Sequence, residues 1–321
     1  MINKLLSRSG YSLVRAAEFA DVKTGKHVLE SITKMYTTPD RKPDYIPAEI
    51  IVFSKDRPLQ LHGLLCSYFG NVINRVPVTI IFSATTESYR KGYEEVFGLF
   101  KKQPVFGIYQ ISTASFRDQL IEKLESMKSE KIFFLVDDIV FTEKLDLDDF
   151  IKFDTRISVP TLRMGANLTR AYTVDRDQPL PGIIPKIIKD SDKICWKWSD
   201  GVYDWGYPLS VDGHLFSTGE ILALARSIPF SSPNTFEAGL QRYDGLFSHR
   251  LGICYRKSKI VNIPVNKVQS DFANIHGSVH QDYLLEQWNK GMQMDFRKLY
   301  GIRNISAHQE VEIGFIKRNG V

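Results

Sequence analysis

The stretch that decides the fold is Lys131-Ile-Phe-Phe-Leu-Val-Asp137-Asp138-Ile-Val-Phe141, in which an apolar run ends at two adjacent acids. Buried strands of parallel sheets are continuous apolar runs of this kind, and open α/β sheets bind ligands beyond the carboxyl ends of their strands. Two neighbouring carboxylates repel each other unless a cation or hydrogen-bond donors lie between them. The stretch therefore predicts an oxygen-rich site for Mg²⁺ or Mn²⁺ carrying a diphosphate. The alternative is a turn in which Asp137 and Asp138 only cap the next segment.

Strand and helix signals alternate around this stretch. Strands are predicted at 49–53, 76–82 and 105–111, and helical patterns follow them at 59–69, 86–100 and 116–128. Such alternation is typical of βαβ units with right-handed crossovers. The sequence therefore predicts an α/β fold with a mainly parallel, Rossmann-like central sheet flanked by helices.

The chain divides into three parts by composition. Residues 1–45 form an N-terminal helical extension, which either contacts anionic lipid through residues 1–20 or packs on the domain. Residues 46–290 form one domain with a nucleotide-sugar lobe at 46–150 and an aromatic-rich acceptor lobe at 151–290. Residues 291–321 are expected to be a polar C-terminal tail.

Composition bounds the class of protein. The 321 residues are 43% hydrophobic and 25% charged, as in ordinary soluble proteins. A net charge of +5 suits an anionic ligand, but the Lys and Arg residues are not clustered, so no nucleic-acid partner is expected. The three cysteines are widely spaced and read as reduced thiols. No apolar run of ~18 residues is present, so we expect a cytoplasmic protein, peripheral at the inner face of the membrane if residues 1–20 bind lipid.

The loop after the first predicted strand is polar. It contains Ser54, Lys55, Asp56 and Arg57, placed to hold a nucleotide: Arg57 can pair with phosphate, and Asp56 can accept from a base or ribose. Neither a Gly-x-Gly-x-x-Gly motif nor a P-loop follows this strand, which argues against Rossmann dehydrogenases, common methyltransferases and P-loop NTPases. The diphosphate must then be neutralised by a metal and by side chains.

Three segments together resemble the glycosyltransferases with the A-type nucleotide-diphospho-sugar fold, in particular family-2-like bacterial enzymes of surface polysaccharide assembly. They are Ile51-Val-Phe-Ser-Lys-Asp-Arg-Pro58, Tyr89-Arg-Lys-Gly-Tyr93 and Phe134-Leu-Val-Asp-Asp-Ile139.

The resemblance implies a site for Mn²⁺ or Mg²⁺ held by Asp138 and Asp137 and completed by His276, with His280 as a substitute. It also implies a donor site formed by Ser54, Lys55, Asp56, Arg57, Asp137 and Asn167. The family has Asp-x-Asp where this chain has Val-Asp-Asp-Ile, so the division of labour between Asp137 and Asp138 stays open.

The acceptor is expected on the second lobe. Sugars stack their CH faces on aromatic rings and hydrogen-bond to polar side chains, and aromatics gather between residues 196 and 207. The alternative is that these rings fill a second core. The predicted acceptor-binding residues are Trp198, Trp205, Tyr207, His214 and Asn234.

A transferase that inverts the sugar needs a carboxylate to accept the proton of the acceptor hydroxyl. Asp212, in a Gly-containing turn, and Glu237, near a predicted helix start, are both candidates, and the sequence does not choose between them. Alternatively, Asn234 and Glu237 form only a capping box.

The sequence thus predicts a metal-dependent glycosyltransferase that moves a sugar from a nucleotide-diphosphate donor to a saccharide or lipid-linked acceptor, in capsule or lipopolysaccharide synthesis. Inversion is favoured over retention because no covalent nucleophile can be named. One alternative is a nucleotidyltransferase, which would require a Gly-rich loop after the first strand. The other is an inactive nucleotide- or carbohydrate-binding module.

Overall fold

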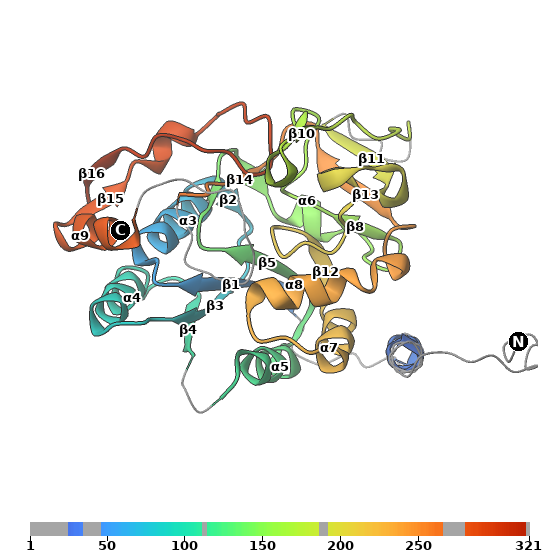
Figure 1. The fold of residues 1–321 in the computed structure, drawn as a ribbon, viewed down its shortest axis with the longest axis horizontal. Helices are drawn as coiled ribbons and strands as arrows, with labels where there is room; N and C mark the ends of the chain where they lie inside the picture. The colour runs from blue at the N-terminus through green and yellow to red at the C-terminus, as the bar shows by residue number, and fades with distance from the viewer. Residues whose placement is uncertain (1–24, 35–45, 111–113, 186–191, 266–279, 319–321) are drawn as a thin grey trace, which may run out of the picture.

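A five-stranded sheet lies at the centre of the computed structural model, which describes residues 25–34, 46–110, 114–185, 192–265 and 280–318 (Figure 1). The strand order is β12-β5-β1-β3-β4. Four strands are parallel, and β12 at one edge runs antiparallel to β5. The strands are β1 (Ile46–Lys55), β3 (Val78–Ser83), β4 (Val105–Tyr109), β5 (Ser129–Val136) and β12 (Leu215–Ser217). The predicted mainly parallel sheet is confirmed.

Helices cover both faces of this sheet. Side chains alternate along β1, so that Ile50 and Val52 enter one core and Ile51 and Phe53 enter the other. Residues of α3, α4 and α9 pack in the first core, and residues of α5, α7 and α8 pack in the second. The helices are α3 (Pro58–Asn71), α4 (Glu87–Leu99), α5 (Phe116–Ser126), α6 (Asp148–Ile151), α7 (Thr218–Ser227), α8 (Pro233–Gln241), α9 (Gln281–Asn289) and a helix at 25–34.

Shorter elements build the second half of the chain. The largest is a three-stranded sheet of β11 (Lys193–Lys197), β13 (Leu251–Tyr255) and β8 (Ser158–Pro160). Two-stranded pairs join β2 (Val72–Ile73) to β7 (Leu145–Asp146), β6 (Ile139–Phe141) to β14 (Ile260–Asn262), β9 (Arg170–Ala171) to β10 (Arg176–Asp177), and β15 (Met292–Met294) to β16 (Phe315–Lys317). Single 3₁₀ turns are η1 (Tyr172–Val174), η2 (Trp198–Asp200), η3 (Tyr203–Gly206), η4 (Asp244–Leu246) and η5 (Phe296–Leu299).

The helix starts follow from capping side chains. Thr86 accepts the backbone N–H of Tyr89 at the start of α4. The capping box at the start of α8 is made by Ser232 and Thr235. The expectation that Asn234 and Glu237 form this box is therefore wrong, and Glu237 is left available for other contacts.

The residues after Gly291 differ from the expected polar tail. Met294, Phe296 and Leu299 are buried in the same core as α3 and α9. Further along, His308 forms a parallel bridge with Asn262 next to β14. Pairing between segments so far apart in the sequence has no local sequence signal. It places the C-terminal segment beside β14, near the end of β5.

Gly252, on β13, lies under the indole of Trp196. A Cβ atom at this position would lie 2.3 Å from the ring atom Cε2 of Trp196, on the neighbouring strand β11. We expect Gly252→Ala to lower the free energy of unfolding by about 1–3 kcal/mol or more, because a packed core resists an added methyl group. Denaturant unfolding measures this. Gly245→Ala is the control, since a Cβ there meets nothing within 4 Å, and equal stability of the two variants would contradict the prediction.

Candidate active site

The carboxyl ends of β1 and β5 meet at one edge of the central sheet. Phe53 of β1 pairs with Val136 of β5, and Asp137 donates its backbone N–H to the carbonyl of Phe53. Because the two strands are parallel, the loop at 54–57 and the acids Asp137 and Asp138 lie side by side. The structure thus brings together the two segments that the sequence singled out.

Asp137 is a buried carboxylate whose oxygens are occupied. Oδ2 accepts from the hydroxyl of Ser54 at 2.7 Å and from the backbone N–H of Lys55 at 3.3 Å. Oδ1 accepts from Nη1 of Arg57 at 3.0 Å. Burial raises the pKa of Asp137, while Arg57, Ser54 and Lys55 oppose this effect. Asp137 therefore organises the loop after β1, and each of its oxygens already accepts from the protein.

Asp138 differs from its neighbour in having a vacant oxygen. Its Oδ2 accepts from Nη1 of Arg57 at 2.9 Å, but its buried Oδ1 has no hydrogen-bond partner. Burial raises the pKa of Asp138 to about 6, with Arg57 opposing and the charges of Asp137 and Asp212 adding to the rise. An unpartnered buried carboxylate oxygen fits a cation or a donor hydrogen supplied by a ligand. Of the two acids, Asp138 is the one that could hold a metal.

Arg57 bridges the two acids and stabilises their negative charge. Its backbone N–H donates to the hydroxyl of Tyr93 at 3.0 Å, and that hydroxyl lies 2.6 Å from Oγ of Ser54. Burial would lower the pKa of Arg57, but Asp137 and Asp138 outweigh it and raise the pKa. Tyr93, on the buried face of α4, is thus part of the site, although it was not among the predicted donor residues.

The other two loop residues lie differently. Asp56 is buried, has a φ of 54° and accepts the backbone N–H of Thr85 at 2.7 Å. Lys55 is exposed. Asp56 therefore shapes the loop against the segment after β3, whereas Lys55 extends into solvent.

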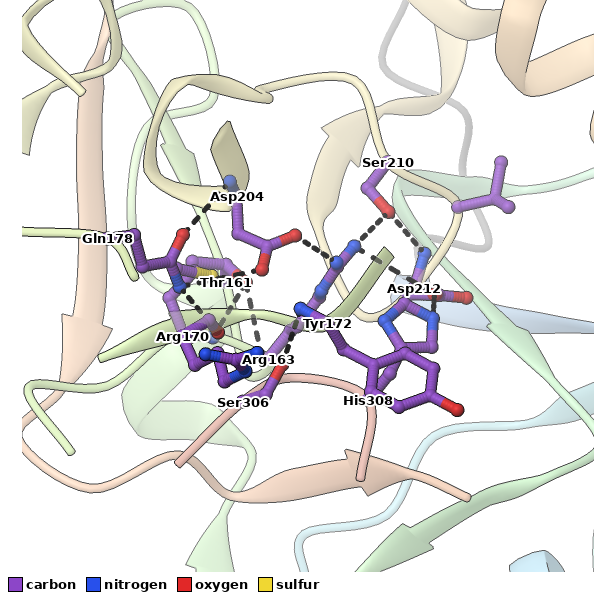
Figure 2. A network of polar contacts seen from close by, with 12 residues as sticks. Thr161, Arg163, Arg170, Tyr172, Gln178, Asp204, Ser210, Asp212, Ser306 and His308 are labelled. Atoms are coloured by element: carbon purple, nitrogen blue, oxygen red, sulfur yellow. Dashed lines mark hydrogen bonds and ion pairs between the residues drawn. The ribbon is translucent and has the colours of Figure 1, made fainter. Parts of the chain in front are cut away.

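A second polar network joins Arg163, Asp204, Ser210 and Asp212 (Figure 2). Asp212 precedes β12, and the backbone N–H of Gly213 donates to the carbonyl of Phe134 on β5. This pairing places Asp212 near Asp138, whose pKa it raises. Asp212 Oδ2 lies 3.5 Å from Nε2 of His308 and 3.9 Å from Nη1 of Arg163.

Arg163 anchors this network from the second lobe. Its Nη2 donates to Asp204 at 2.6 Å and its Nη1 to the hydroxyl of Ser210 at 2.9 Å. The same hydroxyl accepts the backbone N–H of Asp212 at 3.2 Å. Arg163 and Asp204 are both buried, so the Asp204-Trp-Gly-Tyr-Pro segment serves here to hold Arg163 in place.

The two candidate bases have different electrostatic surroundings. Burial alone would raise the pKa of Asp212, but His308 and Arg163 outweigh it and lower the pKa. Burial raises the pKa of Glu237 to about 6, and the charge of Asp212 adds to the rise against the opposing effect of Arg163. Glu237 accepts the backbone N–H of Val211 at 3.1 Å. Asp212 is thus a stabilised anion, whereas Glu237 can change its protonation state near neutral pH.

The predicted acceptor aromatics separate into two groups. Trp198 and Trp205 are at most 1% exposed, and their indole N–H groups donate to the carbonyls of Val159 and Leu168. The prediction that these two rings stack on a sugar is wrong, because they fill the second core. Tyr207 is half-buried and close enough to Glu237 for that carboxylate to contribute to its raised pKa.

Other predicted residues also have structural partners. Nδ1 of His214, a fully buried residue, lies 3.1 Å from the carbonyl of Pro208, and burial lowers its pKa to about 3. This neutral, enclosed ring has no surface for an acceptor, so its predicted role is not supported. The Asn167 amide bonds to Asn304 and to Ser258, which ties up both of its ends and leaves its predicted donor contact without support.

The remaining predictions can be placed only in part. Asn234 is half-buried in the first turn of α8. His276 lies outside the described residues. His280 is exposed, and its side chain caps α9 by accepting from Asp282. Within the described ranges no three His, Cys, Asp or Glu side chains form a group that could hold a metal.

Comparison with known proteins gives only distant likenesses. No protein-family model matches the sequence, and neither does any curated protein. The solved structures similar to this chain include S. aureus TarS (TM-score 0.40, 14% identity, 76% of this chain and 39% of that chain). They also include the mannosyltransferase PcManGT from Pyrobaculum calidifontis in complex with GDP-Man and Mn²⁺ (TM-score 0.30, 11% identity, 48% and 52%).

A third similar structure is a nucleotidyl transferase from a Methanothermobacter (TM-score 0.36, 8% identity, 66% of this chain and 88% of that chain). This chain spans about two fifths of the TarS structure. At such identities and TM-scores we take nothing about activity from these proteins. As for membranes, no helix in the described part of the chain has the length and hydropathy of a span.

Proposed function

We propose that the chain is a glycosyltransferase that uses a nucleotide-diphosphate sugar as donor. One observation carries the proposal: the vacant buried oxygen of Asp138 lies at the carboxyl edge of a parallel sheet, beside Arg57 and near Asp212, which in turn is near Glu237. A cation-binding carboxylate, a phosphate-binding guanidinium and a titratable carboxylate are the groups that transfer from a diphosphate requires.

Each group has a task in this reaction. Arg57 pairs with phosphate oxygens of the donor, and Asp56 and Ser54 shape the loop that receives the nucleotide. Asp138 would hold Mg²⁺ or Mn²⁺, which offsets the charge that builds on the departing diphosphate. Glu237 accepts the proton of the acceptor hydroxyl, and Asp212 accepts a hydrogen bond that orients the acceptor.

The acceptor side of the proposal is a saccharide, free or lipid-linked, of the kind used in bacterial surface polysaccharides, and the stereochemical outcome is inversion. The polar residues for this acceptor are Tyr207, which follows η3 and is near Glu237, and Asn234, which lies one turn before Glu237 on α8. A nucleotidyltransferase is disfavoured because the segment Ser54–Pro58 contains no glycine for a phosphate-wrapping loop.

Donor binding tests the proposal directly. A panel of nucleotide-diphosphate sugars is added to the protein with and without Mn²⁺, and the thermal unfolding of the protein is measured for each donor. A matching donor at a hundredfold its dissociation constant should stabilise the protein by about 2.7 kcal/mol. Asp138→Asn should remove the Mn²⁺-dependent part of this stabilisation, because the cation loses a charged ligand.

The control is Asp200→Asn, which changes an exposed acid on η2. This variant should bind the donor as tightly as the wild-type protein does. If no nucleotide-sugar in the panel stabilises the protein, the proposed function is wrong. If donor binding occurs but Asp138→Asn leaves its Mn²⁺ dependence intact, the metal is bound elsewhere.

A further inference from the structure

The C-terminal segment 304–309 is hydrogen-bonded to β14, next to the candidate site. The backbone of Asn262 donates to the carbonyl of Ala307 at 2.9 Å, and Gln309 donates to the carbonyl of Asn262 at 3.0 Å. Asn304, Ser306 and Ala307 are buried. Because β14 itself pairs with β6, the strand that follows Asp138, this segment has a fixed position relative to the acids.

His308 is the residue that the segment presents to the site. Its side chain is 18% exposed, and its ring is stacked on Tyr172 with the two ring planes inclined by 23°. Tyr172 is held by its backbone N–H, which donates to Ser306, and by its hydroxyl, which donates to Glu310. The imidazole is therefore backed by a fixed ring, with Nε2 pointing toward Asp212 (Figure 2).

The Asp212 carboxylate lies closer to His308 than to Arg163. The guanidinium of Arg163 makes its short contacts with Asp204 and Ser210 and is 3.9 Å from Asp212 Oδ2. His308 Nε2 is closer to the same oxygen, at 3.5 Å. Both contacts are made to the same oxygen, so the imidazole adds a second and shorter restraint on the position of the carboxylate.

We propose that His308 is a positioning residue, which fixes the carboxylate of Asp212 so that it holds the acceptor hydroxyl in line for transfer. The inference rests on the proposed function, because the acceptor is a substrate only if sugar transfer occurs. It gives His308 a role that acts through Asp212, while the charge of His308 also reaches Asp138 and lowers the pKa of that acid.

Two substitutions separate positioning from structure. His308→Ala removes the contact with Asp212, whereas His308→Gln retains an amide N–H donor at a similar reach. In steady-state kinetics with varied acceptor, His308→Ala should lower kcat/KM for the acceptor by about tenfold or more, because small misplacements in the reacting geometry have large effects on rate. The dissociation constant of the nucleoside diphosphate with Mn²⁺ should not change, and His308→Gln should recover most of the loss.

The control is His249→Ala, an exposed histidine on the loop before β13, which should behave as the unchanged protein. Loss of Mn²⁺-dependent nucleotide binding in His308→Ala would overturn the proposal, since His308 would then serve the donor side. Unchanged acceptor kinetics, or no recovery in His308→Gln, would overturn it as well.

A crystal structure of His308→Ala gives a readout without turnover. The proposal expects the Asp212 carboxylate to rotate away from its present orientation, and an unmoved carboxylate would contradict it. If the unchanged protein transfers no sugar but Asp212 still rotates, the proposed function fails while the positioning of Asp212 by His308 stands.

Discussion

Replacing Glu237 by Gln is expected to lower the rate of sugar transfer by about 10²–10⁴-fold, the contribution of a positioned general base. Gln fills the same space and can still accept the backbone N–H of Val211, but it cannot accept the proton of the acceptor hydroxyl. Donor binding should persist, because the donor residues lie on the loop after β1 and at the end of β5. Single-turnover transfer with saturating donor measures the effect.

The pH dependence of the same reaction provides a second measurement. Burial raises the pKa of Glu237 to about 6, and only the ionised carboxylate can act as a base. The acceptor kcat/KM should therefore rise with pH through about 6, and this rise should disappear in Glu237→Gln.

Glu286→Gln, on the exposed side of α9, is the control for the change of charge. This variant should have the wild-type rate of sugar transfer and the wild-type pH dependence of the acceptor kcat/KM. Should Asp212→Asn instead cause the larger loss and Glu237→Gln only a small one, the assignment of the base is reversed.

Replacing Arg250 by Met is expected to lower the free energy of unfolding by about 3–5 kcal/mol, because it leaves the charge of Glu220 buried without a partner. Glu220 is fully buried, and its two carboxylate oxygens accept from Nη1 and Nη2 of Arg250 at 2.9 and 2.8 Å. Arg250 also donates to the carbonyl of Thr155. Denaturant unfolding followed by circular dichroism measures the change.

The double variant Glu220→Leu with Arg250→Met should recover much of the lost stability, since no unpaired charge then remains. Lys290→Met is the control: it breaks an exposed pair with Glu286 on α9 and should change the stability by less than about 1 kcal/mol. A loss in Arg250→Met no larger than in Lys290→Met would show that the buried pair does not stabilise the fold.

Local patterns in the sequence predicted the elements of the fold well. The run ending at Asp137 is β5, and the helical pattern predicted at 59–69 lies within α3. The parallel direction of β1 and β5 also follows from the pattern, because strands that alternate with helices are typical of parallel sheets. Their adjacency in the sheet, which brings the loop of Arg57 beside the acid pair, was not predicted.

The second lobe was harder to predict because burial there depends on distant partners. Trp198 and Trp205 have the composition of a sugar-binding surface, but strands β8 and β13 and their loops enclose them. Arg163 and His308 were missed since each reaches Asp212 through contacts between segments far apart in the sequence. No periodicity or short motif reports such a contact.

The guanidinium between Asp137 and Asp138 has a practical consequence for handling the protein. Since Arg57 is an internal counter-ion for the two acids, we expect the native state to persist without divalent ions in the medium. Preparations made in the presence of a chelator should then keep the same circular dichroism spectrum, and metal can be added back afterwards as an independent variable.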